Sequence, residues 1–387
     1  MKPVSTRLLA YELYFPLAAF AAVSALLVSL RLIEWSAVPA GNLAAVHWHA
    51  HEMLFGPFAI GFAGVMLTAL PRWTGGAPPR PLVLVLLALP WIAARFAFAA
   101  GGADRTALLL SPVAILGLAG YAAFRILAAR DARDYGLVAL LALFAAADAV
   151  FLLHDESLGL RLGFAAAAMI ATIMSGRVAP ALTRHLAGKH GRTQAAPTPR
   201  ALETGALVAM LAALAAWSLA PDARATAPLL ALAAVALAVR AATWAPGSTL
   251  AHPPFLALHV GHLFLPLGLA FQAGAIALAD PRLTDAALHA WGTGVFGLMC
   301  AAVQASQIRR WSGRALEPSP LADLVMFALG LAVVLRLAAL VVQPTRAIAA
   351  AAGLAWIIGW VLMLALIARS PRPAAEDETA APTSDAA

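Results

Sequence analysis

The sequence contains a run of three histidines within five residues, His47-Trp48-His49-Ala50-His51, followed directly by Glu52. Neutral imidazole is a good ligand for haem iron, copper and zinc. Alternate residues of an extended segment point the same way, whereas on a helix only His47 and His51 share a face. The run therefore predicts a metal site in a segment that is partly non-helical, with Glu52 orienting one imidazole. The alternative is a solvated loop at a membrane edge, where the histidines contact lipid headgroups.

Three more histidines lie in long apolar segments near the C-terminal half of the chain. His259 and His262 are three residues apart, so they share one face of the expected helix. They are candidate ligands, although an interhelical hydrogen bond or a proton relay explains them equally well. His289 begins the next apolar segment and becomes a candidate ligand as a partner of the triple run. The candidate metal ligands are thus His47, His49, His51, His259, His262 and His289.

The elements that carry these histidines are expected to be membrane-spanning helices. Of the 387 residues 62% are hydrophobic and only 12% are charged, whereas soluble domains carry about 25% charged residues. Segments of about 20 apolar residues, the length of one membrane span, recur from end to end. They are too long and continuous for a β-barrel. The sequence predicts an all-α, polytopic integral membrane protein of about twelve helices, at residues 12–33, 52–71, 81–100, 107–128, 135–153, 161–180, 203–220, 226–243, 254–278, 286–307, 321–341 and 347–368.

The distribution of basic residues predicts the orientation of these helices. Most of the 26 Lys and Arg residues fall on one set of alternate connections, and basic connections stay in the cytoplasm. Both termini are therefore expected to be cytoplasmic, and the first apolar run is interpreted as a retained span. The net charge of +7 reflects this topology and does not indicate nucleic-acid binding.

A basic, proline-containing connection divides the chain. We expect a first six-helix half at residues 1–182, a cytoplasmic linker at 183–202, a second six-helix half at 203–369 and a disordered cytoplasmic tail at 370–387. The single cysteine, Cys300, excludes an intrachain disulfide, an iron–sulfur cluster, a cysteine-rich zinc site and covalent haem attachment through paired cysteines.

Four stretches of the sequence resemble the signature of a known family. The first is HWHAHEMLFGPFAIGFAGVMLTALPRWTG, at residues 47–75. Three shorter stretches follow in matching order: SGRVAP with TR at 175–184, LHVG with PLGL at 258–269, and ALHA with a glycine-rich continuation at 287–299. Together they resemble the NnrS family of bacterial membrane proteins over nearly the whole chain.

This resemblance implies a twelve-span protein of the bacterial inner membrane that contains haem and copper. It also implies a role in nitric-oxide metabolism or in protection from nitric-oxide stress. Carried over to this chain, the expected ligands of a b-type haem are His49, His51, His259 and His289, with Arg177 as a partner of a haem propionate. The expected gaseous ligand is nitric oxide, and no motif for docking an electron donor is visible. Turnover, sensing and sequestration of nitric oxide all stay open.

Two other classes of membrane protein fit part of the pattern. Two six-span halves joined by a basic connection also describe a secondary transporter of the major-facilitator type, with its substrate site at mid-membrane. The spans, however, lack deep acidic residues. A distant haem–copper oxidase would also have twelve spans, but the sequence has no adjacent histidine pair.

Overall fold

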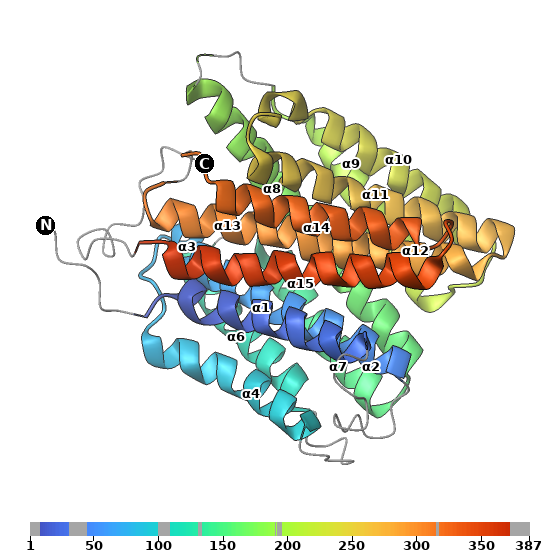
Figure 1. Cartoon of the computed structure of the whole chain (residues 1–387), viewed down its shortest axis with the longest axis horizontal. Helices are drawn as coiled ribbons and strands as arrows, with labels where there is room; N and C mark the ends of the chain where they lie inside the picture. The colour runs from blue at the N-terminus through green and yellow to red at the C-terminus, as the bar shows by residue number, and fades with distance from the viewer. Residues whose placement is uncertain are drawn as a thin grey trace, which may run out of the picture. The chain divides into compact units, whose positions relative to one another are not determined.

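The chain folds entirely into helices in a computed structural model that describes residues 8–30, 45–99, 109–130, 134–189, 191, 196–314 and 317–371 (Figure 1). Within these residues there is no strand. The predicted tail from 372 onward and linker residues 190 and 192–195 lie outside the described residues. The helices fall into two compact units, one built mainly from residues before Ala167 and the other mainly from residues 168–306 and 316–362.

Unit 1 is formed by the N-terminal helices. They are α1 (Ala10–Ser29), α2 (Ala45–Met53), η2 (Leu54–Phe58), α3 (Ala59–Thr74), α4 (Pro81–Ala99), α6 (Leu110–Ala129), α7 (Tyr135–Leu153) and the first part of α8 (Glu156–Lys189). Helix α1 packs against η2 and α3, and α6 packs against α3, α4 and α7. The core between them is aromatic, with the wholly buried side chains of Phe15, Phe55 and Phe151.

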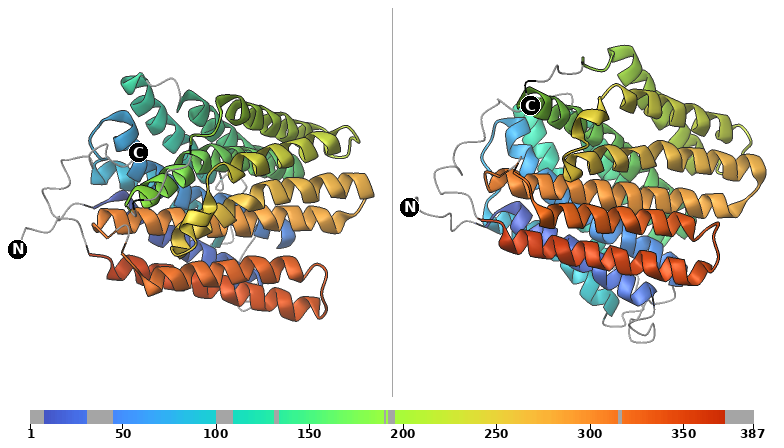
Figure 2. Two further views of the ribbon diagram at one scale, coloured as in Figure 1. Left: turned by 90° about the horizontal axis from the view of Figure 1, so that it is seen from above. Right: turned by 45° about the horizontal axis from the view of Figure 1, so that its top comes forward.

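Unit 2 contains the rest of α8 and most of the later helices, whereas the ends of α13, from Gln307, and of α15, from Met363, belong to unit 1. The later helices are α9 (Arg200–Leu219), α10 (Thr226–Ala242), η4 (Pro246–Thr249), α11 (Pro253–Leu278), α12 (Pro281–His289), η5 (Ala290–Met299), α13 (Cys300–Trp311), α14 (Pro320–Ala338) and α15 (Thr345–Arg369). Helices α9, α10 and α11 lie side by side, and α11 also packs against α12, η5 and α14 (Figure 1). Helices α14 and α15 form a hairpin in both views of Figure 2.

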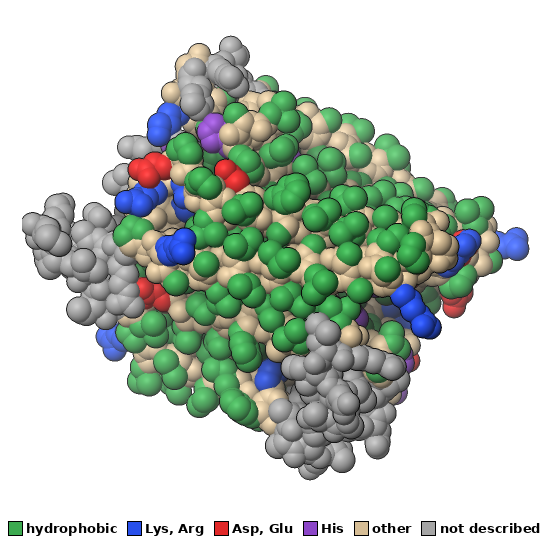
Figure 3. Space-filling model, viewed as in Figure 1, with side chains coloured by type: hydrophobic (Ala, Val, Ile, Leu, Met, Phe, Trp, Pro, Cys, Tyr) green, Lys and Arg blue, Asp and Glu red, His purple; other side chains and the backbone are tan. Residues whose placement is uncertain are grey.

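The prediction of a helical membrane protein is confirmed. Ten helical segments of the described residues are long and apolar enough to cross a membrane, because α2, η2 and α3 run on as one helix, as do α12, η5 and α13. Two shorter apolar helices, Pro81–Ala97 and Thr226–Ala242, coincide with the two remaining predicted spans. Figure 3 shows hydrophobic side chains along α14 and α15, with charged side chains towards the helix ends. Phe327 and Val334 of α14 are exposed. Apolar helices exposed in this way suit lipid, where backbone polar groups must be satisfied within each helix. The number twelve, the orientation and the two predicted halves stay predictions.

Two helices contain π-helical segments, η2 and η5. Pro57 lies within η2, where it lacks an N–H and its ring crowds the preceding turn, which disfavours regular α-helical hydrogen bonding at this point. The sequence of η5, AWGTGVFGLM, is rich in glycine, which weakens the preference for a regular α-helix. Segments of this type are frequent at functional sites. Each begins within three residues of a histidine predicted to bind a metal, His51 before η2 and His289 before η5.

Candidate metal centre

The most completely buried imidazole with an unsatisfied nitrogen is that of His262 in α11. Its side chain is 0% exposed, its Nδ1 lies 2.8 Å from Ser175 Oγ of α8, and its Nε2 has no hydrogen-bond partner. The Ser175 hydroxyl also lies 3.3 Å from the carbonyl of Thr172, and when it donates to that carbonyl it accepts from His262 Nδ1. In that tautomer the ring proton is on Nδ1 and the lone pair is on the buried Nε2.

His259 lies one turn before His262 and is held in a similar way. Its Nε2 lies 2.8 Å from Thr183 Oγ1, and this hydroxyl donates to the carbonyl of Ala179. His259 Nε2 consequently carries the proton, and the lone pair falls on Nδ1. Trp244 packs against both rings, with its ring centre 4.5 Å from that of His262 and 6.1 Å from that of His259. Both histidines make the interhelical hydrogen bonds that were one of the alternatives in the sequence.

His289, the last residue of α12, also offers one nitrogen. Its Nδ1 lies 2.8 Å from the carbonyl oxygen of Asp285 and 2.9 Å from that residue's carboxylate, and both groups only accept. Arg336 of α14 holds the other carboxylate oxygen at 3.1 Å. The lone pair of His289 is thus on Nε2. An imidazole whose second nitrogen donates to a carboxylate or carbonyl is the usual arrangement of a metal ligand.

The histidines of α11 and His289 cannot hold the same metal ion. A Cβ on Gly261 would lie 2.5 Å from the Cβ of Met299, so this part of α11 is level with the end of η5. His289 precedes Met299 by the ten residues of a π-helical segment, which separates them along the helix by more than about 10 Å, somewhat less than an α-helix of that length. Ligand bonds to iron, copper or zinc are about 2 Å long. The α11 histidines and His289 therefore lie at two separate places in unit 2.

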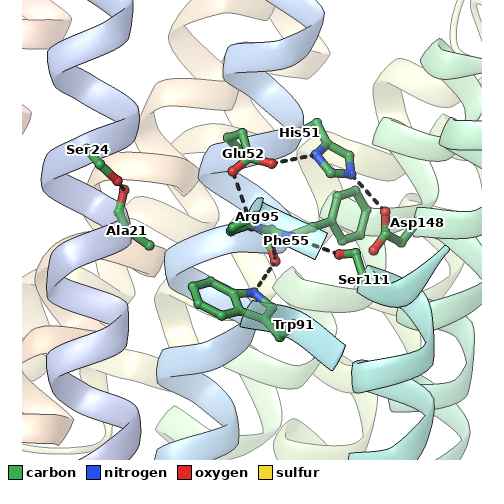
Figure 4. A network of polar contacts seen from close by, with 9 residues as sticks. All are labelled: Ala21, Ser24, His51, Glu52, Phe55, Trp91, Arg95, Ser111 and Asp148. Atoms are coloured by element: carbon green, nitrogen blue, oxygen red, sulfur yellow. Dashed lines mark hydrogen bonds and ion pairs between the residues drawn. The ribbon is translucent and has the colours of Figure 1, made fainter. Parts of the chain in front are cut away.

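The histidines of unit 1 are arranged differently, and Figure 4 shows the network around His51. His51 is wholly buried, with Nε2 2.9 Å from Asp148 Oδ1 and Nδ1 3.1 Å from Glu52 Oε1. Ionised carboxylates only accept, so both nitrogens of His51 donate and neither offers a lone pair here. Arg95 forms an ion pair with Glu52 (3.2 Å) and donates to the carbonyl of Phe55 (2.8 Å).

The other two histidines of α2 contact side chains of unit 1. His47 forms an ion pair with Glu156 at the start of α8 and is partly exposed. His49 Nδ1 lies 2.7 Å from Ser29 Oγ, a hydroxyl that donates to the carbonyl of Ala25. The expectation of a partly non-helical segment is wrong for these residues, because Ala45–Met53 is an α-helix. Within the described residues, no group of three or more His, Cys, Asp or Glu side chains is arranged to hold one metal ion.

The chain matches the family model described as NnrS protein over residues 7–371. It belongs to the NnrS family. No curated protein matches it. Membership of the NnrS family is consistent with a role in the nitric-oxide response, and the resemblance found in the sequence motifs is confirmed.

The first two residues of the family motif SGRVAP, Ser175 and Gly176, have structural roles. Ser175 orients His262, and Gly176 makes room for the guanidinium of Arg240. Arg177, the predicted propionate partner, is exposed on α8, and its role stays a prediction. The buried arginine near the α11 histidines is Arg240. Its burial could have been suspected from Glu203, the one acidic residue in the first turn of α9.

Proposed function

We propose that this NnrS-family chain is a haem-binding protein of the bacterial inner membrane that binds nitric oxide, with copper as a second metal. The observation that carries the proposal is the Nε2 atom of His262, which is buried and has no hydrogen-bond partner while Nδ1 of the same ring contacts Ser175. An unsatisfied buried nitrogen costs about 1–3 kcal/mol, and coordination to a metal would remove that cost.

The donor atoms fit the two metals. Imidazole suits both haem iron and copper, and the two positions in unit 2 would serve two separate centres. His262 would hold one metal at α11 with His259 beside it, and His289 would hold the other at the end of α12. His49 stays a predicted ligand in unit 1, whereas His51 would first have to release a carboxylate. A haem iron with one imidazole ligand supplies an open position for nitric oxide, and one with two ligands supplies electron transfer.

The residues around α11 would control protonation and solvent. The hydroxyl of Ser175 would keep the proton of His262 on Nδ1, so that Nε2 stays available. The indole of Trp244 packs against His262 and lies near His259, and both histidines are buried. Small apolar gases dissolve in the bilayer and need no polar channel to reach such a site.

The optical spectrum and metal content of the detergent-purified protein test the proposal. We expect Soret and α bands with iron in the preparation, loss of a set of bands or of copper in His262→Ala and His289→Ala, and weaker metal retention in Ser175→Ala. Outer-shell partners of this kind typically contribute 10–100-fold in metal affinity. His154→Ala is the matched control, because this histidine is exposed at the turn between α7 and α8.

A colourless and metal-free wild-type protein would refute the proposal and would favour the transporter class instead. Retention of all bands and metals in single Ala variants of His49, His51, His259, His262 and His289 would refute the ligand assignments.

A further inference from the structure

Arg240 is the largest charged side chain buried in unit 2. It is 0% exposed although it lies near the end of α10. Its Nε and Nη2 both donate to the carboxylate of Glu203, at 2.7 and 2.5 Å, and Nη1 donates to the carbonyl of Thr172 at 3.0 Å. This bidentate pairing fixes the plane of the guanidinium. The acidic partner is less buried than the arginine, since the Glu203 side chain is 37% exposed.

Gly176 of α8 leaves the space that this guanidinium occupies. A Cβ on Gly176 would lie 1.7 Å from Arg240 Nη2 and 2.7 Å from Cζ, so only glycine is compatible with the observed position. The residue directly before Gly176 is Ser175, which orients His262. One turn of α8 thus positions both the arginine and the histidine.

Trp244 connects the guanidinium with the α11 imidazoles. Arg240 Cζ lies 5.2 Å from the centre of the Trp244 ring, and the same ring centre is 4.5 Å from that of His262. The guanidinium is consequently within about 10 Å of the imidazole, a range over which charges in a poorly screened interior interact appreciably. Both the guanidinium and the imidazole are 0% exposed, so solvent screens the charge little at this place.

We infer that the metal at His262 is the haem and that Arg240 is a positioning residue whose positive charge, partly balanced by Glu203, sets the reduction potential of that haem. The inference rests on the proposed function. A cation near a haem stabilises the reduced form, which has one positive charge less than the oxidised form. Because Glu203 is the more exposed partner, water already weakens its field, and the field of Arg240 dominates at the imidazole.

Redox titration of the bound haem, followed by its absorption bands, tests the inference with two variants of the same ion pair. Arg240→Met removes the cation and should lower the midpoint potential. Glu203→Gln leaves the cation unbalanced and should raise it. If the pair had only a structural role, both substitutions would shift the midpoint potential in the same direction, since each breaks the same contacts. Arg282→Gln is the control, because Arg282 is an exposed cation paired with Asp280 and should leave the potential unchanged.

The possible outcomes separate the two proposals. A wild-type protein without haem bands overturns the proposed function and this inference together. Normal wild-type bands with shifts of the same sign, or no shift in Glu203→Gln, overturn only the inference. If Arg240→Met does not fold, Arg240→Lys is compared with Glu203→Gln instead. Because lysine keeps the positive charge, the midpoint potential of Arg240→Lys should lie nearer to the wild-type value than that of Glu203→Gln.

Discussion

Substitution of Gly176 by alanine should destabilise the protein through one identifiable clash. The new Cβ would lie 1.7 Å from Arg240 Nη2, and the guanidinium cannot move without losing its bonds to Glu203 and to the Thr172 carbonyl. Overpacking costs about 1–3 kcal/mol, and each hydrogen bond of a charged group contributes about 1.5–3 kcal/mol before discounting for the partly exposed carboxylate. Alanine returns up to about 1 kcal/mol through its higher helix propensity. We expect a net loss of about 2 kcal/mol.

Thermal unfolding of the detergent-purified variants measures this loss as a fall in apparent Tm of a few degrees. The matched control is Gly205→Ala in α9, where a Cβ would meet no atom within 4 Å and the variant should be neutral or slightly stabilised. The decisive variant is Gly176→Ala combined with Arg240→Ala. Without the guanidinium, the additional alanine should cost nothing. The reasoning is refuted if Gly176→Ala behaves like Gly205→Ala, or if its cost persists in the absence of the Arg240 side chain.

Two further substitutions test other parts of the chain. Gly261→Ala should lower the apparent Tm more than Gly176→Ala does. Its Cβ would meet the Cβ, Cα and N atoms of Met299 at 2.5–3.0 Å, and backbone atoms cannot rotate away as a side chain can. An unchanged Tm would contradict this packing. Asp155→Asn should reduce stability by its full amount above about pH 4 and by progressively less as the pH falls below it. The Leu158 N–H donates to the Asp155 carboxylate (2.9 Å) at the start of α8 and holds the pKa of this carboxyl below its ordinary value, so the stabilisation is complete above the unfolded pKa and is lost as the pH falls through the folded one. Melting curves of the wild type and the Asn variant between pH 7 and pH 3 should converge, and a constant difference would exclude this role.

The helical membrane architecture was predictable from the sequence because it depends on a local property. A helix in lipid satisfies its own backbone, so twenty apolar residues suffice to indicate it wherever they occur. The π-helical segments were not predictable, since their hydrogen bonds have no hydrophobic period of their own. The prediction that the histidine run is partly non-helical was wrong for a related reason. Its polar side chains suggested the end of a span, but Asp148 and Glu52 neutralise His51 in the bundle and let the helix continue back to Ala45.

The partners of the histidines were invisible because they are distant in sequence. Thr183 and Ser175 contact His259 and His262 across 76 and 87 residues, respectively, and a lone serine or threonine in an apolar segment carries no signal of its partner. A charged side chain near the end of a span can extend to the membrane–water interface, yet Asp148 is wholly buried against His51. Chain position alone does not distinguish a charge that reaches the interface from one that turns inward.

The buried histidines of the two units therefore differ in chemistry. His259 and His262 each face a hydroxyl that already donates to its own helix, and His289 faces a carbonyl and a carboxylate. Each of these partners accepts a hydrogen bond from one ring nitrogen. The lone pair of the other ring nitrogen stays available. His51 faces two carboxylates, which together favour a ring protonated on both nitrogens. Since a metal needs the lone pair and an ion-pair network needs the proton, the α11 and α12 histidines suit coordination, whereas His51 suits charge balance with Glu52, Asp148 and Arg95.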